Sequence, residues 1–357
     1  MASARTRLQL ELIDVWQRRG ALAWLLYPLS VLHYLVYSAR RALYALGVLR
    51  QTRLDVPVVV IGNLYVGGTG KTPLTIELVR ALAARGWRPA IVSRGYGSAG
   101  SVARLVRPDD SARDVGDEPL LMARSTRVPV AVGHKRVAAG RLLRARYPEC
   151  NVVVADDGLQ HWPLARDMEI ALLNHRGLGN GWLLPAGPLR EPGHRLDRVD
   201  AVVCNGDVPH IETAAARYST RTRLGDARPL QSGPSPQSLS SLAAEQGRDT
   251  LRIAAAAGIG APDRFFAMLR AAGLAIDEMP LADHFDFLSN PFAGLAVDRI
   301  LITEKDAVKC EANPALAGDA RIWVVPLVTE IDPRLVDVVV ERLHRTSRRT
   351  ALGPSAA

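Results

Sequence analysis

The chain has 357 residues, of which 48% are hydrophobic and 23% charged, an ordinary composition for a globular protein and a length that suits two domains. Its three cysteines, Cys150, Cys204 and Cys310, lie far apart, which excludes a CxxC metal or redox motif and favours a reducing, intracellular compartment. The formal net charge is +9, and most of this excess lies near the N-terminus.

Residues 1–53 carry eight arginines against two acidic residues, together with several Trp and Tyr. The apolar run ALAWLLYPLSVLHYLVYSA (21–39) is interrupted by Pro28, Ser30 and His33, and it is shorter than the roughly 20 apolar residues of a spanning helix. No small-residue cleavage site follows, which argues against a signal peptide. Flanking arginines and aromatic residues predict a helix in the membrane interface, with a core helix or a membrane span as alternatives. The aromatic residues are mixed with Leu and Val, so nucleic-acid binding is not expected.

The next segment, VVVIGNLYVGGTGKTPLT (58–75), reads as an apolar strand, a glycine-rich loop and the start of a helix. This order is typical of a loop that binds nucleotide phosphates through backbone N–H groups and the helix dipole. Lys71 can reach the terminal phosphates, and the Thr72 hydroxyl can bind Mg²⁺. A plain glycine-rich turn is the alternative. The predicted phosphate-binding residues are Tyr65, Val66, Gly67, Gly68, Thr69, Gly70, Lys71 and Thr72, with Tyr65 standing where the strict motif has its first glycine.

Beyond residue 55, short β-rich runs alternate with helical patterns, which predicts parallel strands joined by helices. Strands are expected at 56–61, 89–93, 128–132, 151–155, 168–173 and 199–204, with helices at 72–85, 117–125 and 134–147. A turn-rich stretch follows and predicts a linker. A second, smaller α/β unit is expected from strands near 251–257, 275–280, 299–303 and 322–327 and helices near 262–273, 305–312 and 333–346.

The predicted organisation therefore has five parts. They are a membrane-associating helical segment (1–53), a phosphate-loop domain (54–225), a linker (226–250), a smaller C-terminal α/β domain (251–346) and a disordered tail (347–357).

Carboxylates follow two of the predicted elements. The strand within NVVVADDGLQH (151–161) ends in Asp156 and Asp157, and a carboxylate next to a phosphate loop commonly holds magnesium. Neighbouring strand residues point to opposite faces, so at most one of the two is expected to ligate well unless the strand has already ended, and a plain turn is the alternative. Asp117 and Glu118 begin a helical pattern, where an acid can accept a proton or simply stabilise the helix dipole.

His284, in LADHFDF, is a second candidate for proton transfer, because histidine accepts a proton near neutral pH. A purely structural histidine is the alternative. The segment Thr303-Glu304-Lys305-Asp306 contains the letters of a guanine-reading motif in the wrong order, so guanine specificity is not supported.

Two arginines and one long loop could contact a substrate. Arg94 follows a predicted strand, at the edge of the sheet where ligands bind in open α/β folds. Arg136 opens a predicted helix and could meet a phosphate. The loop GLGNGWLLPAGPLREP (177–192) is long enough to shape a binding site, with Arg190 and Glu191 at its polar end.

An ordered series of segments resembles the tetraacyldisaccharide 4'-kinase family, the lipid A 4'-kinases of Gram-negative bacteria. The segments are GNLYVGGTGKTP (62–73), SRGYG (93–97), VGDEP (115–119), ADDGLQH (155–161), GNGWLLPAGPLREP (179–192), AAAAGIGAPDRFF (254–266), LADHFDF (281–287) and TEKDAVK (303–309). The DDGxQH and LLPAGPLREP patterns are highly specific. The family's loops carry the GG-x-GKT form, so Tyr65 counts towards this resemblance.

The resemblance implies ATP-dependent phosphorylation of the 4'-hydroxyl of a tetraacylated glucosamine disaccharide 1-phosphate, with ATP and Mg²⁺ as cofactors, to give lipid IVA. It implies two α/β/α sandwich domains with mostly parallel sheets, the larger one similar to P-loop NTPases, joined by a short β linker. The site is expected between the domains, and the N-terminal helix on the cytoplasmic face of the bacterial inner membrane. The expected partners are the lipid substrate and the membrane surface, and the expected state is a monomer.

By motif, the resemblance also implies roles for single residues. Lys71 and Thr72 match the phosphate and magnesium residues, and Asp156 and Asp157 match the acidic pair near the metal. Asp117 matches the base, and His284 matches a histidine that assists it from the second domain. Weaker candidates for substrate contacts are Arg94, Glu118, Arg136, Gln160, His161 and Arg190. A regulatory or assembly ATPase and a lipid-binding protein without catalysis are the alternative functions.

Overall fold

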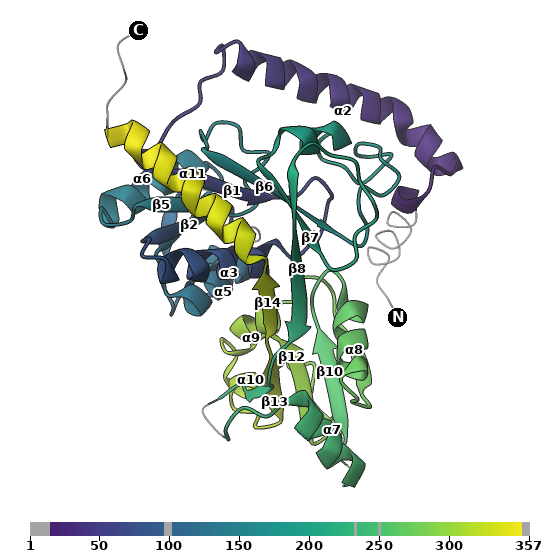
Figure 1. The fold of residues 1–357 in the computed structure, drawn as a ribbon. Helices are drawn as coiled ribbons and strands as arrows, with labels where there is room; N and C mark the ends of the chain where they lie inside the picture. Colours follow the sequence, from purple (N-terminus) through teal and green to yellow (C-terminus); the bar gives the residue numbers. More distant parts are fainter. Residues whose placement is uncertain (1–14, 96–101, 232–233, 249–250, 352–357) are drawn as a thin grey trace.

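The computed structural model describes residues 15–95, 102–231, 234–248 and 251–351, and it contains two α/β domains (Figure 1). The larger domain is built on a nine-stranded sheet with the order β14-β8-β7-β6-β1-β5-β2-β4-β3, parallel except at β3–β4 and β8–β14. Its central strands are continuous Val, Ile and Ala runs that are fully buried, as expected for a sheet covered on both faces. The strands are β1 Val58–Gly62, β2 Pro89–Ser93, β3 Arg104–Val106, β4 Val130–Val132, β5 Val152–Ala155, β6 Met168–Asn174, β7 Ala201–Asn205, β8 Ala216–Leu224 and β14 Leu327–Ile331.

Helices cover both faces of this sheet. One apolar cluster joins it to α3 and α5 through residues such as Leu78 and Leu120, and a second joins the opposite face to α6 through Leu143. The strands and helices predicted for this region are confirmed. Each predicted end lies within two residues of the observed end. The helical segments are α3 Lys71–Ala84, α4 Ala112–Val115, α5 Asp117–Thr126, α6 Arg136–Arg146 and the 3-10 turn η1 Gly193–Arg198.

The smaller domain has a five-stranded sheet with the order β11-β10-β12-β13-β9, parallel except at β9–β13. Apolar clusters around Phe266 on one face and Phe292 on the other complete a second three-layer sandwich. Its elements are β9 Arg228–Pro229, α7 Leu239–Arg248, β10 Ile253–Ala257, α8 Pro262–Ala271, β11 Asp277–Pro280, β12 Arg299–Thr303, α9 Glu304–Cys310, α10 Pro314–Ala317 and β13 Ile322–Val325.

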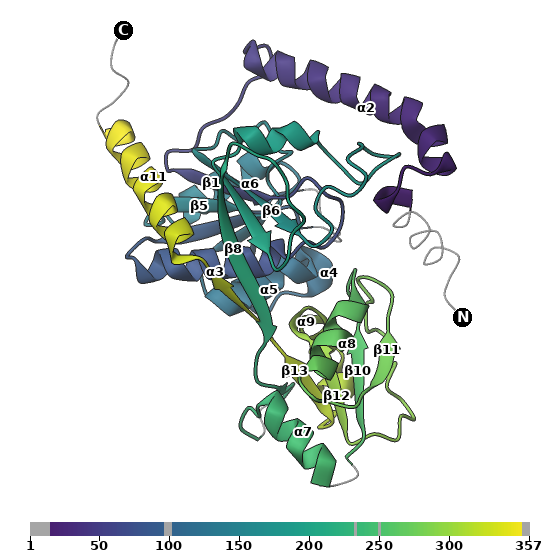
Figure 2. The same cartoon turned by 45° about the vertical axis from the view of Figure 1, so that its right-hand side comes forward.

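The expected linker, residues 226–250, is wrong. The connection between the domains is the antiparallel pair β8–β14, which extends from one domain to the other (Figures 1 and 2). The alternating Arg and Thr residues of β8 are those of a half-exposed strand, whose side chains alternate between two faces. The 226–250 segment instead belongs to the smaller domain, because Ala227 and Leu242 are buried in its core.

The predicted C-terminal domain of 251–346 is also wrong at its end. After β13 the chain returns to the larger domain as β14 and α11, Pro333–Ala351. Leu335, Val339 and Leu343 of α11 are buried in the core of the larger domain. The expected tail at 347–357 is helical as far as Ala351, and its remaining residues, 352–357, lie outside the described part of the chain.

Helix α2, Ala21–Ala45, lies across the end of the larger domain that is farthest from the smaller domain in both views (Figures 1 and 2). Ala23 and Ser30 are its buried residues, so it is not a helix of the protein core. The helix continues through Pro28 and past the apolar run to a length of 25 residues. By length and composition it could cross a membrane, the one such helix in the described residues.

The polar residues that interrupt the apolar run attach α2 to the loop at 177–192. The Ser30 hydroxyl donates to the Leu183 carbonyl (2.7 Å) and accepts from the Ala186 N–H (3.0 Å). His33 Nδ1 lies 3.2 Å from the Leu184 carbonyl. These bonds fix which face of α2 meets the protein and leave the apolar face exposed.

We expect Leu335→Ala to destabilise the larger domain by about 2–5 kcal/mol, because it removes a fully buried side chain of α11 from that core. Urea unfolding measures the change. The control is Arg348→Ala on the exposed face of the same helix, for which less than about 0.5 kcal/mol is expected. Equal unfolding midpoints for the two variants would show that α11 does not contribute to this core.

Candidate active site

The predicted phosphate loop connects β1 to α3. Gly70, the residue before α3, has a left-handed backbone with φ of 95°, and a Cβ there would lie 2.6 Å from the Asn205 amide nitrogen. Only glycine therefore fits at this turn. Lys71 and Thr72 occupy the first turn of α3, where the backbone N–H groups have no partner within the helix. The loop thus presents the N–H groups and the lysine that phosphate binding requires.

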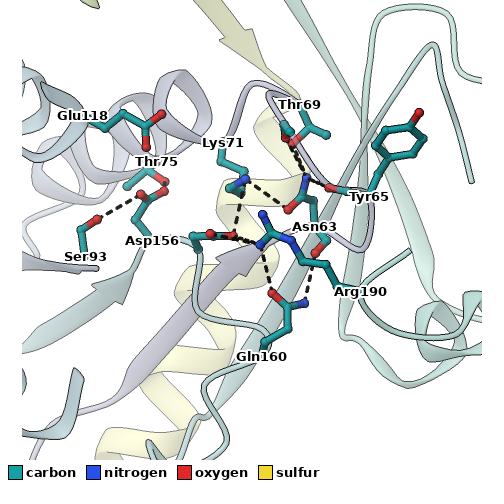
Figure 3. A network of polar contacts seen from close by, with 12 residues as sticks. Asn63, Tyr65, Thr69, Lys71, Thr75, Ser93, Glu118, Asp156, Gln160 and Arg190 are labelled. Carbon is teal, nitrogen blue, oxygen red and sulfur yellow. Dashed lines mark hydrogen bonds and ion pairs between the residues drawn. The ribbon is translucent and has the colours of Figure 1, made fainter. Parts of the chain in front are cut away.

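Asn63 organises this loop, although no motif in the sequence pointed to it. Its buried side-chain amide donates to the Tyr65 carbonyl (2.5 Å) and to the Thr69 hydroxyl (3.0 Å). Its carbonyl oxygen accepts from Lys71 Nζ at 3.1 Å (Figure 3). One amide therefore fixes the loop backbone and the lysine together.

The backbone of Tyr65 does not have a positive φ, so this position does not need the glycine of the strict motif. Its ring points away from Lys71 in Figure 3 and packs 4.6 Å from the guanidinium of Arg176. Its hydroxyl accepts from the Gln17 amide at 3.0 Å. The side chain thus joins the loop to the N-terminal segment.

Asp156 and Asp157 follow β5 and have different surroundings. Asp156 is only 1% exposed and accepts hydrogen bonds from the hydroxyls of Thr75 (3.0 Å) and Ser93 (3.4 Å). Burial, helped by the charges of Glu118 and Asp157, raises the pKa of Asp156 to about 7. Ionised, this carboxylate would face the site with no cation hydrogen-bonded to it in the described structure, which suits a metal ligand.

Asp157 is surrounded by cations instead. Lys71 Nζ lies 3.4 Å from its Oδ1, and Arg190 Nη1 lies 3.0 and 3.1 Å from its two oxygens. Burial alone would raise the pKa of Asp157, but these two charges outweigh it and hold the pKa below its usual range. The strand ends at Ala155 and Asp157 has a positive φ of 48°, so the different surroundings of the two aspartates arise in a turn rather than from alternation along a strand.

The donor set fits magnesium. Within the described ranges no group of three or more His, Cys, Asp or Glu side chains could hold a metal ion. Magnesium usually takes only one or two carboxylates and completes its shell with substrate phosphates and water. A buried aspartate beside a phosphate loop therefore suits Mg²⁺ better than a transition metal.

The weaker site candidates divide into two groups. Gln160 is hydrogen-bonded to the Asn63 carbonyl (3.1 Å) and to Glu191 (2.7 Å), and it accepts from Arg190 (3.3 Å), so it supports the loop. The others have separate surroundings. Arg94 is exposed after β2, while the following residues of its motif, 96–97, lie outside the described part of the chain.

Arg136 is buried and His161 is half-buried. Arg136 donates to the Asp157 backbone carbonyl (3.2 Å), and its Nε has no hydrogen-bond partner among the described residues. Burial lowers the pKa of Arg136 to about 10, so it remains a cation at neutral pH. Burial and the neighbouring charge of Arg136 lower the pKa of His161 to about 4, so it is neutral there.

Asp117 and His284 meet across the two domains. Asp117 opens α5 in the larger domain, His284 lies in the smaller domain, and His284 Nδ1 is 2.9 Å from Asp117 Oδ2. Burial would raise the pKa of Asp117, but the hydrogen bond from His284 and the charge of Lys305 hold it below its usual range. The carboxylate is thus an ionised, largely buried acceptor at the domain boundary.

Sequence reasoning missed several residues that complete the site. Thr75 and Ser93 hold Asp156, and Asn63 holds Lys71. Lys305 and Lys309 of α9 each lie 3.8 Å from Asp117 Oδ2. The TEKDAVK segment contains both lysines, so a signal was present, but nothing in it indicated that they face a carboxylate of the other domain.

A mostly parallel sheet that carries a phosphate loop, with a buried carboxylate bonded to a histidine of a second domain, defines an ATP-dependent phosphotransferase of the P-loop class. A family model described as tetraacyldisaccharide-1-P 4'-kinase matches residues 22–344, so the chain belongs to that family. The family predicted from the sequence motifs is confirmed.

Close relatives cover almost the whole chain. It is 50% identical over 355 residues to the tetraacyldisaccharide 4'-kinase of Herminiimonas arsenicoxydans, covering 96% of this chain and 98% of the relative. It is 49% identical over 349 residues to that of Janthinobacterium sp. (strain Marseille), covering 97% and 99%. Among solved structures, LpxK from Aquifex aeolicus, described as a complex with ATP, has a TM-score of 0.77 at 28% identity and covers 90% of this chain and 99% of that chain. The predicted α/β fold class is confirmed.

The raised pKa of Asp156 predicts a pH-dependent stability. Between pH 3.8 and about 7 the folded protein holds a proton on Asp156 that the unfolded chain has lost. The free energy of unfolding should therefore fall as the pH rises through this window, by at most about 1.4 kcal/mol per pH unit, and level off above it. Asp156→Asn should remove this dependence in urea titrations of the protein free of nucleotide and metal.

Asp157→Asn is the control, because the pKa of Asp157 is lowered and its contribution has the opposite sign. That variant should lose stability above pH 4 relative to the wild type, and the difference should vanish as the pH falls through the lowered pKa. The same sign for both variants would contradict the assigned surroundings.

Proposed function

We propose that this chain transfers the γ-phosphoryl group of ATP to the 4'-hydroxyl of a tetraacylated glucosamine disaccharide 1-phosphate, giving lipid IVA. The contact between Asp117 and His284 carries this proposal, at 2.9 Å. A phosphate loop alone serves any ATPase, but transfer to an alcohol needs a group that accepts the hydroxyl proton. Membership of the tetraacyldisaccharide 4'-kinase family supports the substrate.

The phosphate loop is proposed to bind the ATP phosphates through its N–H groups and Lys71. Asn63, at 3.1 Å from Lys71 Nζ, keeps the ammonium group over the loop. Thr72 and Asp156 would hold Mg²⁺, with Asp157 as the alternative carboxylate. The ion would supply positive charge that neutralises the phosphate oxygens. Positioning and charge neutralisation then account for most of the rate enhancement.

Asp117 is proposed to accept the proton of the acceptor hydroxyl late in the transfer, because a free alcohol is a far weaker acid than the carboxylic acid. His284 donates to the other side of the same carboxylate and orients it. Since the two residues belong to different domains, domain closure on both substrates would complete the site and limit idle hydrolysis of ATP.

Two arginines remain candidates for a substrate phosphate. Arg94 is exposed directly after the carboxyl end of β2. Arg136 has an Nε with no hydrogen-bond partner among the described residues. Arg190 is engaged by Asp157, so we assign it to positioning of that carboxylate. His161 is neutral at physiological pH and would contribute a hydrogen bond rather than charge.

Helix α2 is proposed to lie in the cytoplasmic face of the bacterial inner membrane. Its polar residues Ser30 and His33 bind the loop at 177–192, while Leu25 and Leu32 are 75% and 57% exposed. An apolar helix face of this kind belongs in the interface of a bilayer. The substrate carries four acyl chains, so the site must work beside the bilayer that holds them.

Transfer of radiolabelled phosphate from ATP to purified disaccharide 1-phosphate tests the reaction. Labelled lipid at the 4'-position is the expected product. Tight ATP binding without any labelled lipid would contradict the proposal and favour a regulatory ATPase or a lipid-binding protein.

Asp117→Ala should lower kcat by about 10²–10⁴-fold, because it removes the proton acceptor, while the affinity for ATP changes little. Steady-state kinetics and equilibrium binding of an ATP analogue measure the two effects. The matched control is Asp114→Ala, an exposed acid three residues earlier, which should leave both unchanged. Parallel loss of kcat and ATP affinity in Asp117→Ala would assign Asp117 to nucleotide binding.

Leu32→Asp should reduce binding to phosphatidylethanolamine–phosphatidylglycerol vesicles at least about tenfold, since it removes an apolar side chain from the proposed membrane face and adds a charge. ATP affinity should not change. Leu288→Asp is the control, because Leu288 is equally exposed (58% against 57%) but lies in the smaller domain. Equal vesicle binding by both variants would exclude α2 as the membrane contact.

A further inference from the structure

Lys305 has no role in the reaction described so far, yet it lies against both members of the Asp117–His284 pair. Its Nζ is 3.4 Å from His284 Nε2, 3.8 Å from Asp117 Oδ2 and 3.3 Å from Glu118 Oε1. The imidazole of His284 is therefore placed between a carboxylate at Nδ1 and an ammonium group at Nε2.

The chemistry of these two neighbours determines the tautomer of His284. A carboxylate only accepts hydrogen bonds and a lysine ammonium only donates them. Nδ1 must therefore carry the proton that is donated to Asp117, and Nε2 must present its lone pair to Lys305. Both contacts select the same neutral Nδ1–H tautomer. A proton on Nε2 would point an N–H at the ammonium group and break that contact.

We propose that Lys305 is a positioning residue for phosphoryl transfer, which holds His284 in the neutral Nδ1–H tautomer by donating to Nε2. This inference rests on the proposed role of Asp117 as the proton acceptor. A neutral N–H donor orients the carboxylate and lowers its basicity less than an imidazolium would at the same distance of 2.9 Å. Lys305 thus orients Asp117 through a neutral histidine, while its own charge, 3.8 Å from Asp117 Oδ2, lowers the pKa of that carboxyl.

The charged groups around His284 have opposite effects on its pKa. The hydrogen bond to Asp117 raises the pKa of His284, while burial and the charge of Lys305 lower it. Asp283, on the same loop, lies 3.9 Å from Nε2 and also raises that pKa. Glu118 on α5 binds Lys305, and Lys309 on α9 lies near Asp117, so both act on the pair. The pKa of His284 is raised overall. When His284 takes up a proton at mildly acidic pH, Nε2 no longer accepts from Lys305, whereas the ion pair between Lys305 and Glu118 remains.

The alternative is that Lys305 only stabilises the contact between the domains through its ion pair with Glu118. The domains are also joined by Arg124 of α5 and Glu311, the residue that follows α9, which lie 2.6 Å apart. Loss of Lys305 therefore leaves a second ion pair at this boundary. Lys309 provides a matched control, because it is as far from Asp117 Oδ2 (3.8 Å) but pairs with Asp306 of its own helix at 3.2 Å.

Nuclear magnetic resonance of the full-length protein, labelled with ¹⁵N in its histidine rings, tests the proposal. Long-range ¹H–¹⁵N spectra distinguish the two neutral tautomers and the imidazolium, and His284→Gln assigns the signal. In the wild type at pH 8.5 we expect the Nδ1–H tautomer. An Nε2–H tautomer would overturn the proposal without any variant.

In Lys305→Met, the titration midpoint of His284 should rise by about one pH unit, because a cation next to Nε2 is lost. The acidic limb of the pH profile of kcat/KM should move by the same amount. Lys305→Arg, which keeps a cationic donor, should restore most of both effects, and Lys309→Met should move the midpoint less. An unchanged midpoint in Lys305→Met, or an equal shift in Lys309→Met, would overturn the proposal.

The spectroscopic readout needs no substrate, so it is independent of the transfer assay. Absence of phosphate transfer with an intact Nδ1–H signal would count against the proposed function. Normal transfer with an unchanged midpoint in Lys305→Met would count against the role of Lys305 alone.

Discussion

The position of the phosphate loop depends on one segment, residues 179–192, which is hydrogen-bonded to that loop on one side and to α2 on the other. The Val66 N–H donates to the Pro188 carbonyl (2.9 Å), and the Arg190 N–H donates to the Leu64 carbonyl (2.8 Å). From the opposite side, Ser30 of α2 bonds the backbone at 183–186. The candidate nucleotide site and the helix proposed to meet the membrane are therefore hydrogen-bonded to the same segment.

Local patterns predicted most of the fold because they depend on residues close in sequence. Continuous apolar runs gave the parallel strands, and the phosphate loop followed from its glycines and Lys71. Contacts between residues far apart in the sequence left no such local pattern. The apolar face of α11, formed by Leu335, Val339 and Leu343, shows that the helix packs, but not on which domain. Asn63 and Lys305 are ordinary polar residues until the fold brings them to Lys71 and His284. Even the motif-based roles of Asp117 and His284 needed the structure to show that their side chains meet.

Burial and neighbouring charges give the aspartates of the site different pKa values. Asp156 and Asp157 are neighbours, yet one is held by hydroxyls with a raised pKa and the other by cations with a lowered pKa. Asp117 is a third case, because its cationic and histidine neighbours all come from the smaller domain. Its ionisation therefore depends on contact between the domains, whereas that of Asp157 is set within the larger domain.

The return of the chain to the larger domain after β13 determines the order in which the nascent protein can fold. β14 and α11, residues 327–351, supply the edge strand of the larger sheet and part of the core around Leu335. These residues leave the ribosome after the whole smaller domain has been synthesised. Domains generally fold as units during synthesis, N-terminal first. Here the smaller domain can complete its core first, while the larger domain, although begun earlier, keeps an uncovered apolar surface until β14 and α11 have been synthesised.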